Sequence, residues 1–172
     1  MGESVLKGKR MLAVDDEPDI LAVLRDELEH HGASLDTALN YEGAIQLLSS
    51  YTYDLVILDI MGVRGFELLT FTVTRNFPVV MLTAHALNPE SLKKSVELGA
   101  RAYIPKDEID HIVPFLEDVL TLSYESAWSV LFEKLGGIFG QHFGPDWRKS
   151  EQEFWDEFER KLKLETATIV RP

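Results

Sequence analysis

The chain has 172 residues, no cysteine and a formal net charge of −12. This length accommodates one domain with a sizeable core plus an appendage, and 45% hydrophobic with 27% charged residues is typical of a globular protein. The composition excludes disulfides and thiolate metal sites. The charge balance argues against nucleic-acid binding, because 20 acids face 10 bases over residues 1–120 and nine face seven over residues 121–172. Residues 1–10 lack the apolar run of a signal peptide, and no stretch reaches the roughly 20 apolar residues that cross a membrane, so we expect a cytoplasmic protein.

Five short apolar runs, each followed by a helical pattern, predict a parallel sheet covered by helices. Pro18, Asn40 and Asn88 have the residue types that begin helices, and Gly32 and Gly99 have the type that ends them. The alternation with short connections predicts an α/β fold with a doubly wound, five-stranded parallel sheet. The predicted strands cover residues 10–14, 33–37, 55–58, 78–82 and 100–104.

Polar side chains stand where four of these strands end. Asp15 and Asp16 follow the first strand, Asp59 the third, Thr83 the fourth and Lys106 the fifth. Because the carboxyl ends of parallel strands share one edge of a sheet, we expect these groups to converge. Three carboxylates in one cleft repel one another unless a cation neutralises them, and their oxygen ligands suit Mg²⁺.

This set of groups suits the chemistry of a phosphoryl group. A metal and an ammonium neutralise phosphoryl oxygens, a hydroxyl donates a hydrogen bond, and an aspartate can accept the phosphoryl group itself. Taken singly, each residue has a plainer interpretation: Asp59 ends a strand, Thr83 caps a helix and Lys106 is a solvated charge. Their joint placement at strand ends favours phosphoryl acceptance by Asp59.

In these motifs, residues 9–120 resemble a response-regulator receiver domain of the CheY-like kind, which has a flavodoxin-like fold. The resemblance implies that Asp59 is phosphorylated by a sensor histidine kinase, a phosphotransfer protein or a small phosphodonor. It also implies a protein that is not an enzyme but assists its own phosphotransfer and dephosphorylation. The residues that carry the resemblance are Asp15-Asp16, Asp59 ending the third strand, Thr83-Ala84 after the fourth, and Tyr103 with Lys106 on the fifth.

The resemblance further implies a metal site and a switch. Asp16, Asp59 and the backbone carbonyl of Met61 would bind Mg²⁺ directly, Asp15 would act mostly through water, and Lys106 would contact the phosphoryl group.

Three more residues would respond to phosphorylation. Thr83 would move towards the phosphoryl group, and Tyr103 would rotate inward behind it. Ala84 is small, which leaves its backbone N–H accessible to the phosphoryl oxygens. Added charge beside a mobile hydroxyl can bias an element that has two arrangements.

Some residues depart from the family pattern. The loop Ile60–Gly65 looks shortened and lacks the usual proline, and Lys106 is followed by Asp107 while Pro105 precedes it. These departures keep open a pseudo-receiver, a binding module not controlled by phosphorylation. An aspartate-nucleophile phosphohydrolase is the third possibility, but such enzymes carry a second acid where this chain has Met61.

Residues 121–172 form an extension beyond the resemblance, with nine of the seventeen aromatic residues and all three tryptophans. Apolar spacing predicts that the preceding helix, which begins near Asp107, runs on to Gly136-Gly137, and a capping box at Ser150 and Glu153 predicts a second helix. Its apolar stripe must pack on the receiver, on a second copy or on another protein. We expect an interaction or dimerisation element, possible homodimers included, rather than a DNA-binding domain.

Overall fold

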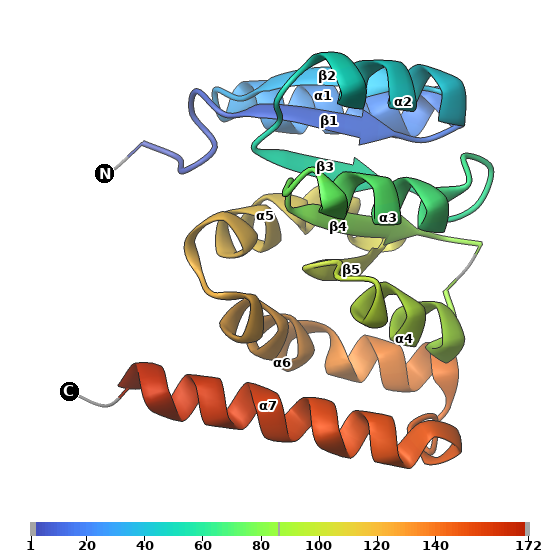
Figure 1. Cartoon of the computed structure of the whole chain (residues 1–172), viewed down its shortest axis with the longest axis vertical. Coiled ribbons are helices and arrows are strands. Elements are labelled where there is room, and N and C mark those ends of the chain that lie inside the picture. Colours follow the sequence, from blue (N-terminus) through green and yellow to red (C-terminus); the bar gives the residue numbers. More distant parts are fainter. Residues whose placement is uncertain (1–2, 86, 171–172) are drawn as a thin grey trace.

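Five parallel strands form one sheet, as the sequence predicts, with helices on both sides (Figure 1). The order of the strands is β2-β1-β3-β4-β5. The computed structural model describes residues 3–85 and 87–170, with side chains as far as Leu164. Every residue of β3, β4 and β5 is buried, which explains their nearly unbroken apolar sequences. The strands are β1 Arg10–Val14, β2 Ser34–Ala38, β3 Leu55–Leu58, β4 Val79–Thr83 and β5 Ala102–Pro105.

Five helices connect and follow the strands, and their polar caps lie where the sequence predicts. The side chain of Asn40 accepts a hydrogen bond from the N–H of Gly43 (2.8 Å), and that of Asn88 accepts one from the N–H of Ser91 (2.8 Å). The helices are α1 Pro18–His30, α2 Tyr41–Ser50, α3 Gly65–Thr74, α4 Pro89–Glu97 and α5 Ile112–Thr121.

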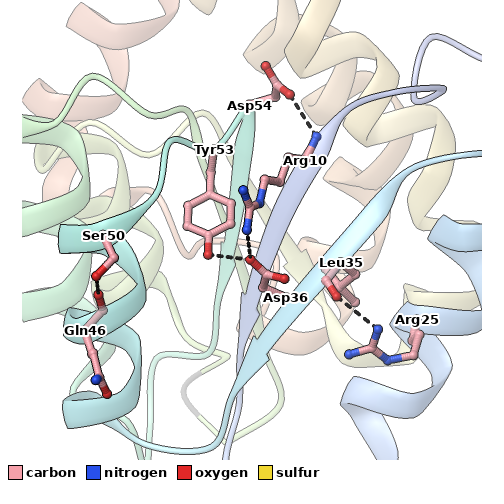
Figure 2. A network of polar contacts seen from close by, with 8 residues as sticks. All are labelled: Arg10, Arg25, Leu35, Asp36, Gln46, Ser50, Tyr53 and Asp54. Carbon is pink, nitrogen blue, oxygen red and sulfur yellow. Dashed lines mark hydrogen bonds and ion pairs between the residues drawn. The ribbon is translucent and has the colours of Figure 1, made fainter.

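A polar network near the amino-terminal ends of the strands ties β1, β2 and β3 together (Figure 2). The Arg10 guanidinium pairs with Asp36 (3.1 Å), and the backbone N–H of Arg10 donates to Asp54 (2.8 Å). Tyr53 also donates its hydroxyl proton to Asp36 (2.7 Å), and burial together with this hydrogen bond raises the pKa of Tyr53. Opposite charges and donors are matched here, so this network stabilises the sheet without requiring a ligand.

The extension differs from the single long helix that the sequence predicts. A 3₁₀ helix, η1 Lys106–His111, precedes α5, and α5 ends at Thr121. A new helix, α6 Tyr124–Phe143, then begins with Ser123 as its N-cap, which accepts a hydrogen bond from the N–H of Ser126 (3.1 Å). The long-helix prediction is wrong because Ser123 satisfies the backbone donors of a fresh helix start.

Helix α6 also continues through the glycines that were predicted to end it. Each glycine costs about 1 kcal/mol relative to alanine in a helix, but the buried stripe of Leu131, Leu135 and Phe139 secures the helix on both sides of Gly136-Gly137. The turn comes at Gly144, where φ is 92°. A 3₁₀ turn, η2 Lys149–Glu151, and the last helix, α7 Gln152–Val170, follow.

The two added helices form an extra layer beyond β5, with α6 against the receiver fold and α7 outermost (Figure 1). Trp128 anchors α6 because its indole N–H donates to the carbonyl of Ala100 (3.1 Å). Trp155 and Phe158 of α7 are buried against Phe132 of α6, with ring centroids 6.2 and 6.1 Å away. The apolar stripe is therefore covered within the chain, as additional core.

Candidate functional site

Lys106, which follows β5, lies among carboxylates from the ends of two other strands. Its Nζ is 2.9 Å from Asp15 Oδ2, 3.6 Å from Asp59 Oδ2 and 3.2 Å from Glu17 Oε1. These residues follow β1, β3 and β5, so the parallel sheet brings together groups far apart in sequence. Asp15, Asp59 and Lys106 are buried, whereas Asp16 is exposed at the rim. The convergence expected from strand-end placement is present.

The charges in this cluster are only partly balanced. Burial, reinforced by the charge of Asp15, raises the pKa of Asp59 to about 6, although Lys106 acts in the opposite direction. Burial also raises the pKa of Asp15. Burial alone would lower the pKa of Lys106, but its hydrogen bond to Asp15 and the charge of Asp59 outweigh it and raise that pKa. One ammonium therefore faces more carboxylate charge than it neutralises.

The loop after β3 passes close to the acids at two glycines, one with a positive φ and one against the backbone. Gly62 has φ of 86°, and a Cβ there would overlap the Asp16 carboxylate. A Cβ at Gly65 would overlap the Asp59 carbonyl oxygen and Ile60, and the N–H of Gly65 donates to the Ile60 carbonyl (3.0 Å). The loop between β3 and α3 therefore lies close to Asp16 and Asp59, and the two glycines make this close approach possible.

The carboxylates fit a divalent cation. Asp15 Oδ2 is buried, and its partner is the Lys106 ammonium 2.9 Å away, which Asp59 and Glu17 share. Oxygen atoms of Asp15, Asp16 and Glu17 lie within 4.8 Å of one another. Clustered carboxylate oxygens with more negative charge than one ammonium neutralises are the ligands that Mg²⁺ prefers. Asp15 and Asp16 could hold such an ion with Asp59 beside it.

Glu17 is a site residue that the sequence reasoning missed. Its backbone N–H donates to Asp15 Oδ1 (2.9 Å) and its carboxylate accepts from Lys106 (3.2 Å), so it positions both groups. The only sequence signal was its place directly after the acid pair. Met61, whose carbonyl is the expected metal ligand, has an exposed side chain, and its ligand role stays a prediction.

The expected switch residues lie on the neighbouring strands. Thr83 is buried at the end of β4, opposite Pro105 of β5, and Ala84 follows it at the surface. Tyr103 is fully buried, and burial raises its pKa to about 12. Its hydroxyl lies 2.7 Å from Ser91 Oγ and accepts a hydrogen bond from the backbone N–H of Asn88 (3.2 Å).

Tyr103 also touches the extension. Its ring centroid is 5.9 Å from that of Phe139 in α6, in an edge-to-face arrangement. The inward position of Tyr103 is therefore held by α4 through hydrogen bonds and by α6 through an aromatic contact. No local pattern in the sequence indicated the second contact.

Comparison with known proteins finds relatives of the part of the chain that contains this site. The family model of the response regulator receiver domain matches residues 11–115. The chain is 32% identical over 105 residues to the transcriptional regulatory protein TcrA of Mycobacterium tuberculosis, covering 59% of this chain and 41% of TcrA. It is 35% identical over 127 residues to the nitrogen assimilation regulatory protein NtrX of Azorhizobium caulinodans, covering 70% of this chain and 26% of NtrX. The chain thus spans less than half the length of these curated relatives.

Solved structures resemble the same part of the chain. TrrA of Thermotoga maritima, solved in complex with Mg²⁺-BeF, is 35% identical with a TM-score of 0.57, and the match covers 65% of this chain and 99% of TrrA. The non-phosphorylated HemR receiver domain of Leptospira biflexa is 31% identical with a TM-score of 0.59, covering 67% and 96%. Within the described residues, no helix is both long and apolar enough for a membrane span.

Proposed function

Because the chain belongs to the response regulator receiver domain family of two-component systems, we propose that it is a signalling switch phosphorylated on Asp59 in a Mg²⁺-dependent phosphorelay. The observation that carries the proposal is the position of Lys106, whose Nζ lies 2.9 Å from Asp15 and 3.6 Å from Asp59 at one edge of the sheet. The ammonium of a lysine between buried acids can pair with a carboxylate before phosphoryl transfer and with a phosphoryl oxygen during it.

In the proposed transfer, an Asp59 oxygen forms a bond to phosphorus while the bond from phosphorus to its donor breaks. The donor would be a phosphohistidine of a sensor kinase or phosphotransfer protein, or a small acyl phosphate. Asp15 and Asp16, with Asp59, would hold Mg²⁺, which neutralises phosphoryl oxygens when bound. Lys106 would neutralise another phosphoryl oxygen, and the N–H of Ala84 would donate to a third.

The proposed readout runs through Thr83 and Tyr103. A phosphoryl group on Asp59 would draw the Thr83 hydroxyl towards it at the end of β4. Since β4 pairs with β5, this movement changes the packing around Tyr103, which contacts α4 and α6. We further propose that residues 9–120 are the receiver and residues 121–172 an extension that reads it, in a cytoplasmic protein that assists its own phosphotransfer and dephosphorylation.

Acetyl phosphate with Mg²⁺ provides the test, with intact-mass measurement of the phosphorylated chain. Wild type should gain one phosphoryl group, and Asp59→Asn should gain none. The exposed acid Asp107 provides the matched control, because Asp107→Asn should behave as wild type. Equal phosphorylation of wild type and Asp59→Asn would rule out Asp59 as the acceptor.

A pseudo-receiver is the second candidate, and the contact between Tyr103 and Phe139 favours it. A helix of the same chain covers the residue that would have to move, which could lock the switch in one state. A pseudo-receiver would have no need for the cation. Mg²⁺ binding to wild type that is lost in Asp16→Ala, measured by calorimetry, would exclude this alternative.

A further inference from the structure

A groove lies between α4 and α7, and residues at the start of α6 also line it. Its volume is about 580 Å³, and its apolar floor consists of Val96, Tyr124, Phe154 and Phe158. Val96 and Phe158 are buried, but Tyr124 and Phe154 remain partly accessible. A hollow of this size accommodates the large side chains of about one helical turn.

The rim of the groove is predominantly acidic. Glu97 stands on α4, Glu125 on α6, and Glu153 and Glu157 on α7. Lys161 is a base on this rim, and Lys93 is already paired across the groove with Glu151 (3.0 Å). Carboxylates around an apolar floor repel anionic surfaces such as nucleic acid or acidic lipid and attract cationic side chains.

A second hollow of about 600 Å³ adjoins the first along α4 and the start of α7. The two share Lys93, Glu97 and Glu151, so the accessible surface is elongated rather than a single closed cavity. An elongated groove between two helices suits a third helix better than it suits a compact small molecule.

We propose that the groove between α4 and α7 is a docking site for a basic amphipathic helix of a partner protein. Apolar side chains of that helix fill the floor between Tyr124 and Phe154, and flanking lysines or arginines pair with Glu153 and Glu157. The site needs α4 of the receiver fold as well as α7 of the extension, so a receiver domain alone would lack it. It does not require phosphorylation of Asp59, so its test is independent of the proposed function.

The probe is a fluorescein-labelled, helix-forming peptide of Leu, Ala and Lys, about 18 residues long, with one apolar stripe flanked by lysines. Fluorescence anisotropy with the full chain should give micromolar binding. A peptide of the same composition with the stripe shuffled should bind at least about tenfold more weakly, because it offers charge without an apolar face.

Charge reversals locate the site. Glu153→Lys with Glu157→Lys changes two exposed acids of the rim and should weaken binding about tenfold or more. Asp26→Lys with Glu29→Lys makes the same change in net charge on two exposed acids of α1 and should leave binding within about twofold. Both variants alter surface residues, and unchanged thermal unfolding verifies that they fold.

Three results would overturn the proposal: no binding to wild type at about 1 mM peptide, equal binding of the shuffled peptide, or equal weakening by the two double exchanges. The last two would mean that the peptide responds only to the overall negative charge.

Discussion

Strand β5 connects two regions that differ in how well their groups are satisfied. They are the carboxylate edge of the sheet and the aromatic layer of the extension. At the end of β5, the single ammonium of Lys106 faces three carboxylates and cannot neutralise all of them. Three residues earlier, Tyr103 sits among satisfied partners, with a hydroxyl partner at 2.7 Å and a ring neighbour at 5.9 Å. The first region is unfinished without a ligand, whereas the second is complete. A cation or phosphoryl group bound at this edge would relieve the repulsion between the carboxylates, and our proposal is that the layer beyond β5 responds to it.

The largest effect we expect is the loss of the completed layer. Trp128→Ala removes a fully buried ring, its hydrogen bond to Ala100 and its packing on Phe132, and should lower the free energy of unfolding by about 3–5 kcal/mol. Trp147→Ala is the matched control, because Trp147 is only half-buried and should cost less. Urea unfolding followed by circular dichroism measures both, and equal losses would contradict the anchoring role of Trp128.

The second prediction concerns the unfinished edge. Lys106→Ala leaves Asp15 and Asp59 buried without their cation and should cost about 3 kcal/mol in chelator. Mg²⁺ should restore more stability to this variant than it adds to wild type, because a second cation can take over the neutralisation. Lys134→Ala removes an exposed pair with Asp118 and should cost less than about 1 kcal/mol. A loss in Lys106→Ala that Mg²⁺ leaves unchanged would show that these acids do not bind the ion.

How far the sequence predicted each region follows from the range of the interactions. The strands and the caps at Asn40 and Asn88 depend on neighbouring residues, so composition and spacing were enough. The carboxylate edge followed because parallel pairing places Asp15, Asp59 and Lys106 together whatever the details of the loops. Glu17 was not predicted as a site residue because its role depends on how far the Lys106 side chain extends.

The extension was less predictable because its structure depends on contacts distant in sequence. Gly136 and Gly137 were predicted to end the helix, but packing of Phe139 on Tyr103 and Phe132 outweighs the cost of these glycines. The break at Ser123 was missed because the apolar spacing from Leu120 to Trp128 continues across it. The residues of the apolar stripe on α7 also do not identify the surface on which the stripe packs.

The third prediction is a substitution that raises the free energy of unfolding, whereas most substitutions lower it. Asp59→Asn removes a buried charge whose pKa is raised to about 6, and in chelator at neutral pH it should stabilise the protein by about 1–2 kcal/mol. The control is Asp54→Asn at the other end of β3, which replaces a charge-assisted hydrogen bond from the N–H of Arg10 by a weaker neutral one and should destabilise. Destabilisation by both would mean that the two ends of the strand are equally satisfied.

The fourth and smallest prediction is a pH dependence of the metal-free protein. Between pH 3.8 and about 6 the folded state retains on Asp59 a proton that the unfolded chain has lost. The unfolding free energy contributed by Asp59 should therefore fall as pH rises through this window and stay constant above it. Subtracting the profile of Asp59→Asn isolates this contribution from other acids. A difference that is flat, or that rises with pH, would contradict the raised pKa.

Tryptophan fluorescence tests the central claim most directly, that the unfinished edge and the complete layer communicate through β5. All three tryptophans, Trp128, Trp147 and Trp155, lie in the extension and none in the receiver. Adding Mg²⁺ and beryllofluoride should change the emission of wild type and leave that of Asp59→Asn unchanged. If wild type gains thermal stability from the two ligands while its tryptophan emission stays constant, the site is filled but the extension does not respond, and the account is wrong.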